Sequence, residues 1–481
     1  MLSHRILYIL FALLSISALF ANCEGFNNQN LPKWLFALFF AALLGIAYAI
    51  KLMIHSVVKR DLVKGYIVII IVSCSLQSLY GLFQIIEATI YSYIGQLQIS
   101  GSFDTIGGFV GCLCAGIPLF FTKTEGNSPL CRIIKILLII AILVVFISKS
   151  RSGIISVSFV LAYWVAFKYQ ISKRLQYVTI AGMVFLFIGF YFLKKNSADG
   201  RLLIWRCCWE MIKDKPFLGH GLKAFDAHYM DYQADFFSKN PESKFAILAD
   251  NVKHIYNEFI SLSIHFGIVG WVFVFALILL LIHCYKKNAS LEARTSMLSL
   301  ISIGIFAFFS YPFEYIFIWI VALLDIIIII HEAYAHITLK SILVRAFISI
   351  TILGASFFTI YKVCLCTCLE LEWNKIAIIA CQGQMAEVSQ RYQKLMYPFG
   401  KNPKFLYNYA VELYMIEKYE SSIHIARECR KYYADYDLEL LLAMNAIKMN
   451  YFKEAEGYLQ SASLMCPNRF VPLFELVCAS L

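Results

Sequence analysis

The sequence predicts an all-α fold: a polytopic helical membrane protein of about 11 transmembrane helices, followed by a C-terminal helical-repeat domain. The first observation is composition. The 481 residues are 60% hydrophobic and 15% charged, whereas soluble domains are about half apolar and a quarter charged. The second is a series of apolar runs of roughly 20 residues, which match the hydrocarbon core of a bilayer. The third is a loose repeat after the last run.

The apolar runs predict spans near residues 4–21, 33–54, 62–85, 106–122, 131–149, 152–169, 175–194, 258–284, 295–312, 314–331 and 343–364. The first run could also be a signal peptide, because Arg5 precedes it. Asn22 before Cys23 is a poor cleavage residue, however, and favours an uncleaved first helix.

The net charge of +11 argues for membrane topology and not for nucleic acid, because it lies in alternate loops. The basic residues of these loops are Lys51, Lys59, Arg60 and Lys64; Lys123 and Arg132; Lys168, Lys173 and Arg174; Lys286, Lys287 and Arg294; and Lys340 and Arg345. The positive-inside rule then puts these loops and the N-terminus inside. It puts the polar loop 195–257 and the tail 372–481 outside.

The tail 372–481 carries a repeat of about 33 residues, from Tyr419 to Phe452. Pro403 recurs as Pro467. The pattern resembles tetratricopeptide repeats, whose helix pairs stack into concave surfaces, although an ordinary helical tail remains an alternative. We expect the tail to hold an acceptor or to place the protein, and not to break bonds.

The polar loop 195–257 is the only sizeable polar stretch before the tail. An amphipathic helix is predicted over 201–214, with Asp199 as its N-cap. Such a helix could lie on the membrane surface. Its predicted apolar face consists of Leu202, Trp205, Trp209 and Ile212.

Three arginines are candidate phosphate ligands. Arg151, next to Lys149, lies in a short outer connection where basic residues are disfavoured. A guanidinium matches phosphate oxygens in bidentate geometry, although interfacial snorkelling also explains it. Arg201 and Arg206 lie in the polar loop and could stabilise the charge that grows on a departing diphosphate, although either could equally be a solvated surface charge.

His254 is the candidate general base, because a neutral imidazole accepts a proton near neutral pH. Asn257 and Glu258 follow on the next turn and could orient it. The alternative is a structural histidine. No cysteine or histidine spacing indicates a structural zinc site, so neither a metal nor a cofactor is expected.

Together these motifs resemble the O-antigen ligase and polymerase superfamily, which includes bacterial O-oligosaccharyltransferases. The matching segments, within residues 35–330, are Gly101-Ser102-Phe103-Asp104, Lys149-Ser150-Arg151-Ser152-Gly153, Gly200-Arg201-Leu202-Leu203-Ile204-Trp205, Lys215-Pro216-Phe217-Leu218-Gly219-His220-Gly221 and His254 with Asn257-Glu258. Many members have His-x-His-Asn at the last motif. This chain has Tyr256 in place of the second histidine, so His254 would have to serve alone.

The resemblance implies an enzyme of the bacterial inner (cytoplasmic) membrane. Such an enzyme moves a glycan from undecaprenyl diphosphate to a periplasmic acceptor, without metal or nucleotide. Residues 1–365 would form the transmembrane glycan-transfer domain. Arg151 and Arg201 would bind the diphosphate, and His254 would activate the acceptor hydroxyl. The other residues at the substrate site would be Lys149, Arg206, Gly219, Gly221, Asn257 and Glu258.

The acceptor stays open: lipid A core for a ligase, another glycan unit for a repeat-unit polymerase, or a protein. Two non-enzymatic functions also stay open. One is a transporter of lipid-linked glycan, although neither internal repeats nor broken helices are clear in the sequence. The other is an envelope scaffold that uses its tail to hold a partner.

Overall fold

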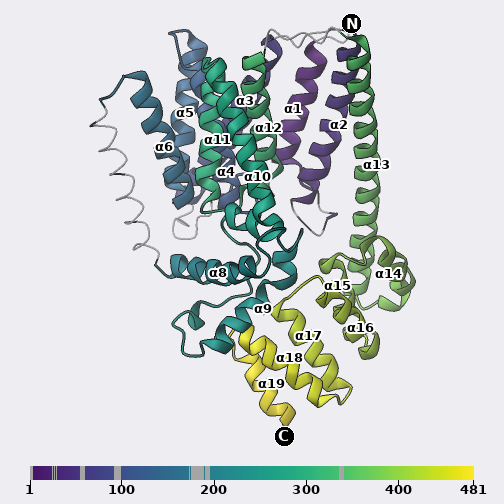
Figure 1. Ribbon diagram of the computed structural model, residues 1–481. Helices are drawn as coiled ribbons and strands as arrows, with labels where there is room; N and C mark the ends of the chain where they lie inside the picture. The colour runs from purple at the N-terminus through teal and green to yellow at the C-terminus, as the bar shows by residue number, and fades with distance from the viewer. Residues whose placement is uncertain are drawn as a thin grey trace. The chain divides into compact units, whose positions relative to one another are not determined.

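Figure 1 shows a computed structural model that describes residues 4–23, 25–26, 28, 30–54, 60–90, 99–172, 195–334 and 341–480, with the single residues 174, 182 and 189. Within these ranges every regular element is helical. The chain divides into two compact units. The first, here the membrane unit, contains Met1–Phe190 and Ala276–Cys368. The second, here the polar unit, contains Tyr191–Phe275 and Leu369–Leu481.

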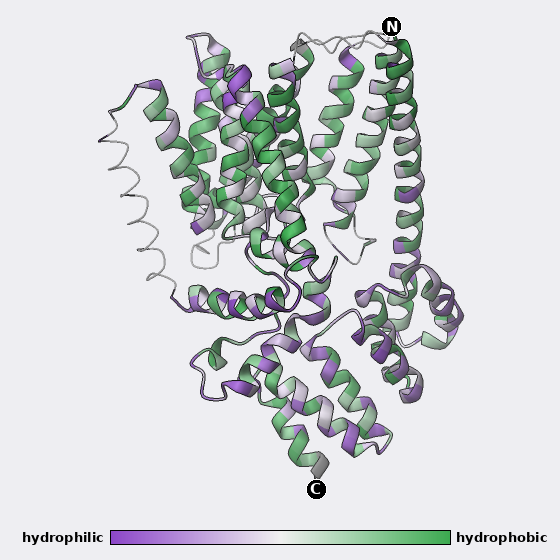
Figure 2. Cartoon of the chain, in the orientation of Figure 1, coloured by the Kyte–Doolittle hydropathy of each residue, from purple (hydrophilic) through white to green (hydrophobic). Residues whose placement is uncertain are grey.

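The membrane unit consists of long apolar helices, which are mostly hydrophobic along their length in Figure 2. They are α1 (His4–Phe20), α2 (Leu31–Ile54), α3 (Arg60–Ile90), α4 (Ile106–Phe120), α5 (Pro129–Ile147), α6 (Arg151–Lys168), α11 (Leu291–Ala307) and α12 (Ile316–Tyr334), with the 3₁₀ turns η2 (Phe121–Lys123) and η4 (Pro312–Glu314). Two further helices, α10 (Glu258–Lys287) and α13 (Ile342–Cys381), contribute to both units.

The predicted polytopic, all-α fold is confirmed. Every predicted span coincides with a helix except 175–194, most of which lies outside the described residues. Seven of the helices in the described ranges are long and apolar enough to cross a membrane, and α1 is a shorter apolar helix. Helix α13, which contains the last predicted span, runs on to Cys381 and therefore well past its predicted end near residue 364.

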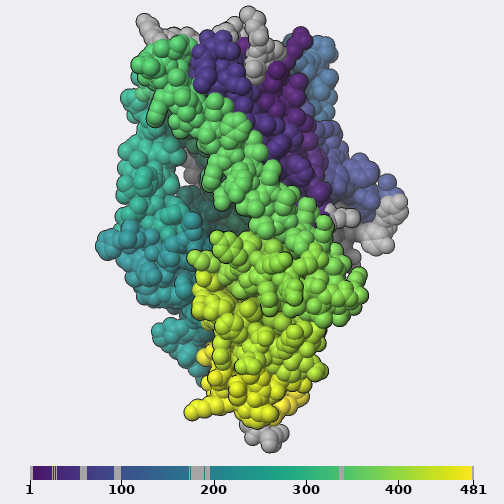
Figure 3. Space-filling model, turned by 90° about the vertical axis from the view of Figure 1, so that its right-hand side faces the viewer, coloured from purple at the N-terminus to yellow at the C-terminus, as the bar shows by residue number. Residues whose placement is uncertain are grey.

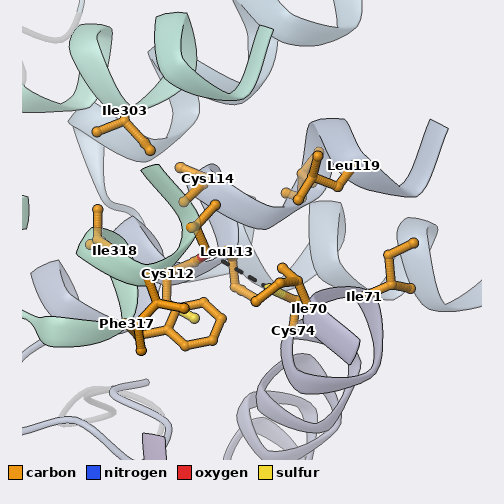
Figure 4. Packing of buried hydrophobic residues seen from close by; sticks show 14 of the residues in the cluster. Ile70, Ile71, Cys74, Cys112, Leu113, Cys114, Leu119, Ile303, Phe317 and Ile318 are labelled. Atoms are coloured by element: carbon orange, nitrogen blue, oxygen red, sulfur yellow. Dashed lines mark hydrogen bonds between the residues drawn. The ribbon is translucent and has the colours of Figure 1, made fainter. Parts of the chain in front are cut away.

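The core of the membrane unit lies around α4, nearly all of whose side chains are buried. Figure 4 shows Cys112, Leu113 and Cys114 of α4 packed against residues of α3, α11 and α12. Serine hydroxyls join the helices where they touch. Ser299 and Ser302 of α11 each donate to a backbone carbonyl of α4, at 2.7 Å. Small polar residues of this kind allow helices to approach closely in lipid.

The polar unit contains α8 (Lys195–Asp214), α9 (Ala224–Lys239), the 3₁₀ turn η3 (Ala246–Leu248), α14 (Met385–Phe399), α15 (Pro403–Met415), α16 (Tyr419–Arg430), α17 (Tyr436–Lys448), α18 (Phe452–Met465) and α19 (Val471–Ser480). The tail residues, coloured yellow-green to yellow, form one continuous mass in the space-filling view of Figure 3. One core lies within the tail and the end of α13. A second combines residues 203–264 with residues 434–466.

The tail has a regular internal spacing. Asn402 caps α15 and Asp435 caps α17, each through a side-chain oxygen that accepts from two backbone amides. Their positions differ by 435 − 402 = 33 residues. Helices α16 and α18 also begin 33 residues apart, at Tyr419 and Phe452. The identity of these pairs as tetratricopeptide repeats stays a prediction.

Two details predicted for α8 are wrong. The helix begins at Lys195, so Asp199 lies inside it and is not its N-cap. Its buried face consists of Leu203, Ile204, Cys207, Cys208 and Met211, which pack into the core shared with the tail. In the predicted face Leu202 is 43% exposed and Trp209 57% exposed. Trp205 and Ile212 of the predicted face are half-buried and pack against the edge of the same core, so the prediction is wrong for Leu202 and Trp209 and missed the fully buried residues.

Candidate functional site

Helix α8 holds the segment 254–258 through two contacts. Trp205 donates its indole N–H to the carbonyl oxygen of Ile255, at 2.9 Å. One turn earlier, the Arg201 guanidinium lies 4.9 Å from the centre of the Tyr256 ring. A cation over an aromatic face is attracted by the ring quadrupole. Arg201 is thereby brought to the same segment as His254.

Tyr256 gives this segment its shape. Its φ is 55°, in the left-handed region that side chains other than glycine rarely adopt. Its ring centre lies 6.1 Å from that of His254. The next residue, Asn257, is 7% exposed and caps α10, because its Oδ1 accepts from the amides of Phe259 and Ile260 at 2.9 and 3.1 Å. Glu258 is the first residue of α10.

The motif 216–221 crosses α10 where this helix is kinked. Gly267 has φ 57° and ψ −147°, which interrupts the helical backbone. The amides of His220 and Gly221 donate to the carbonyls of Ile264 and His265, at 2.7 and 3.1 Å. In return, the amides of residues 268 and 269 donate to the carbonyls of residues 216 and 217. The motif therefore satisfies backbone groups that the kink frees.

Gly219 and Gly221 differ within that crossing, although both have positive φ, at 69° and 90°. A Cβ on Gly219 would lie 2.6 Å from the backbone of residues 264–266, closer than real Cβ atoms come. A Cβ on Gly221 would meet nothing within 4 Å. Close backbone packing accounts for Gly219. Gly221 borders open space, and its place at a substrate site stays a prediction.

The loop and the tail are one folded body. Gln233 of α9 donates to the carbonyl of Met465 at 2.7 Å, and the amide of Ala434 donates to the carbonyl of Asp226 at 2.9 Å. Arg430 of the tail pairs with Asp231 of α9. These contacts surround the core that combines the two segments. The tail thus contributes part of the hydrophobic core of the loop that carries Arg201 and His254.

Asp226, in the first turn of α9, is an acid that the sequence reading did not select. Burial raises the pKa of its carboxyl, although Lys223, Lys253 and His265 act in the opposite direction. Raised acid pKa values are frequent at functional sites. In sequence, an acid in a first helical turn indicates only ordinary helix stabilisation. Only Lys223 is close in sequence, and the burial that raises the pKa depends on the fold, so no local signal could have found it.

Arg206 takes another direction from Arg201. Its guanidinium lies 5.7 Å from the centre of the Phe236 ring of α9, and its side chain is exposed. The structure therefore gives Arg206 and Arg201 different aromatic partners.

Arg151 and Lys149 belong to the membrane unit. Arg151 is the first residue of α6, and Ser150 caps that helix by accepting from the amide of Gly153 at 3.4 Å. Lys149 has φ 54°. A Cβ on Gly153 would lie 2.2 Å from a methyl group of Val110, so this glycine lets α6 approach α4 closely. Arg151 thus stands at a fixed helix start.

The matched part of the chain runs from α5 into α10 and includes Arg151, Arg201 and His254. Residues 136–275 match the family model described as O-antigen ligase. This segment is similar to the O-antigen ligase family. The predicted resemblance to the O-antigen ligase superfamily is confirmed over these residues. No curated protein matched the chain.

The match to the O-antigen ligase family supports a membrane function of the glycan ligase or polymerase type. The tail lies outside the matched residues. With the apolar helices described above, the match also identifies the chain as a membrane protein.

Proposed function

We propose that this protein is a membrane glycosyltransferase that moves a glycan from undecaprenyl diphosphate to a hydroxyl of a periplasmic acceptor. The acceptor is lipid A core or a protein, and transfer to another glycan unit is the alternative. The arrangement that carries the proposal is the segment 254–257, which has a histidine at one end, Arg201 stacked on Tyr256, and a place inside the residues that match the O-antigen ligase family.

In the proposed reaction the acceptor oxygen attacks the anomeric carbon, and its proton passes to the neutral ring of His254. The bond from that carbon to the phosphate oxygen breaks, and undecaprenyl diphosphate leaves with the electron pair. Attack opposite the leaving group inverts the anomeric centre. No redox step or added group is required.

The arginines would act on the leaving group. Negative charge grows on the diphosphate as the bond breaks, and a fixed guanidinium stabilises it more in the transition state than in the bound substrate. The contact with the Tyr256 ring limits the movement of Arg201. Arg151 would bind the same diphosphate.

We also propose the orientation. The basic loops alternate along the chain, and the positive-inside rule puts residues 195–257 and the tail on the opposite side from them. In a bacterial inner membrane that side is the periplasm. An alkaline phosphatase fusion is active only when exported, so fusions at Lys195 and Lys401 should both be active. An inactive fusion at either position would overturn this orientation.

The reaction itself is tested with purified protein and lipid-linked glycan extracted from the source cells. Three reactions receive lipid A core, glycan or protein as acceptor. Glycan on one acceptor, with release of undecaprenyl diphosphate, is the expected result, and the acceptor that is used separates ligase, polymerase and protein glycosyltransferase. If no acceptor yields glycan product or undecaprenyl diphosphate, the enzyme proposal fails. That result is the one expected of a transporter or a scaffold.

A further inference from the structure

His254 lies between two anchored stretches of backbone. On the C-terminal side, Ile255 is bonded to Trp205, and Asn257 caps α10. On the N-terminal side the anchors come from the tail. Asn468 donates to the carbonyl of Ala249 at 2.9 Å, and Arg469 pairs with Asp250 at 2.8 Å.

The anchor nearest to His254 is its neighbour Lys253. The Lys253 ammonium donates to the carboxylate of Asp435 and to the hydroxyl of Tyr433, and it lies 4.8 Å from the centre of the Tyr433 ring. The Asp435 side chain is only 3% exposed. Its other oxygen caps α17 by accepting from the amides of Asp437 and Leu438. The tail therefore fixes the position of the carboxylate independently of the lysine.

The segment needs such anchors because of Tyr256. A residue other than glycine in the left-handed region costs about 1–2 kcal/mol, and it persists where its surroundings over-determine it. With φ 55°, Tyr256 would relax if one side of the segment were released. Relaxation would move His254, and displacements of about 1 Å at a reacting group can cost roughly 100-fold in rate.

We propose that Asp435, with Tyr433, is a positioning residue for His254. These two tail residues bind Lys253 and so hold the segment 253–257 in its strained, active conformation. This inference rests on the proposed function of His254. It gives the tail a part in the rate of transfer, in addition to any part in choosing the acceptor.

The test compares kinetics of four single variants and one double variant. Asp435→Asn keeps an oxygen that can cap α17 and loses the charge for Lys253. We expect Asp435→Asn and Lys253→Met each to lower kcat by roughly 10- to 100-fold with little change in KM for the lipid-linked glycan. The double variant should lose no more than either single one, because both remove the same contact. Lys253→Arg keeps the charge and should retain most of the activity.

Arg427→Gln is the matched control. Arg427 forms an ion pair with Glu454 inside the tail, at 2.5 Å, and both side chains are about half exposed. Its removal should leave kcat unchanged. Trypsin resistance of the loop checks folding. Lys253→Met leaves the 3% exposed carboxylate of Asp435 without its cation, so should this variant misfold, Asp435→Asn decides alone, because it leaves unpaired only Lys253, which is 47% exposed.

Unchanged kcat in both Asp435→Asn and Lys253→Met would overturn the inference, and so would additive losses in the double variant. A parallel His254→Ala reaction separates the two levels. If His254→Ala is inactive while Asp435→Asn and Lys253→Met are fully active, only the positioning inference fails. If His254→Ala is fully active, the proposed base itself is wrong.

Discussion

Alanine at Gly219 and at Gly221 should have very different effects, although the two residues are two positions apart in one motif. Both have positive φ, so alanine at either position should cost about 1–2 kcal/mol in backbone strain. At Gly219 the new methyl group would also lie 2.6 Å from backbone atoms of residues 264–266. Backbone cannot rotate away as a side chain can, and such overpacking adds about 1–3 kcal/mol.

Gly219→Ala should therefore destabilise the polar unit by about 2–5 kcal/mol. The hydrogen bonds from His220 and Gly221 to the kinked part of α10 would lengthen, so the loss should appear there first. Hydrogen exchange of the purified protein in detergent measures it, through faster exchange of the amides of residues 220, 221, 268 and 269.

Gly221→Ala is the control for strain without overlap. It should cost about 1–2 kcal/mol and leave exchange at residues 268 and 269 close to that of the unchanged protein. Equal destabilisation by the two substitutions would refute the reasoning, because the close approach at residues 264–266 would then have no energetic effect. Loss of transfer in a folded Gly221→Ala protein would instead indicate that substrate occupies the open space beside this glycine.

Four further outcomes are expected. His254→Ala should slow transfer by roughly 10²–10⁴-fold and remove the acid limb of the pH–rate profile, and an unchanged profile would exclude His254 as the base. Arg201→Ala and Arg151→Ala should each abolish transfer with the protein still inserted in the membrane. Lysine at either position should restore only part of the transfer, because the planar guanidinium with its paired N–H donors is lost. Full activity of either alanine variant would remove that arginine from the mechanism. Truncation after Glu370 should abolish transfer to every acceptor, because it removes the tail residues of the core shared with the loop, and transfer to any acceptor by the truncated protein would contradict this. Burial alone would raise the pKa of Asp435, but the bond from Lys253 and its charge outweigh burial and lower the pKa below its usual value. The stabilisation from the Lys253–Asp435 ion pair is therefore complete above the unfolded pKa of about 3.9, and it is lost as pH falls through the lowered folded pKa. Acid should therefore speed hydrogen exchange at residues 249–255 more in the unchanged protein than in Asp435→Asn.

The spans were predictable because hydropathy and length are local properties. Apolar runs near 33–54 and 131–149 are sufficient to identify α2 and α5. The buried face of α8 was not predictable, because Leu202 and Leu203 are equally apolar and only the packing of α8 against α9 and η3 in the folded core decides which of them is buried.

The candidate site was likewise predictable only in part. His254 and Arg201 could be selected from residue type, spacing and place in the chain. The stacking of Arg201 on Tyr256 could not, because Tyr256 looked like a departure from the family pattern. Likewise Lys253 looks like one more surface charge, and only the fold brings it to Asp435.

The core shared by the loop and the tail has a consequence for how the protein is made. Residues 203–264 leave the ribosome well before residues 434–466, with membrane helices synthesised in between. At about 5–20 residues per second, the loop waits roughly 10–40 s for Met465 and the rest of its own core. During that interval the half-built core exposes apolar surface, which is a target for chaperones and proteases. The enzyme should therefore mature only after its tail has been translated, and nascent chains with a complete membrane unit should still be inactive.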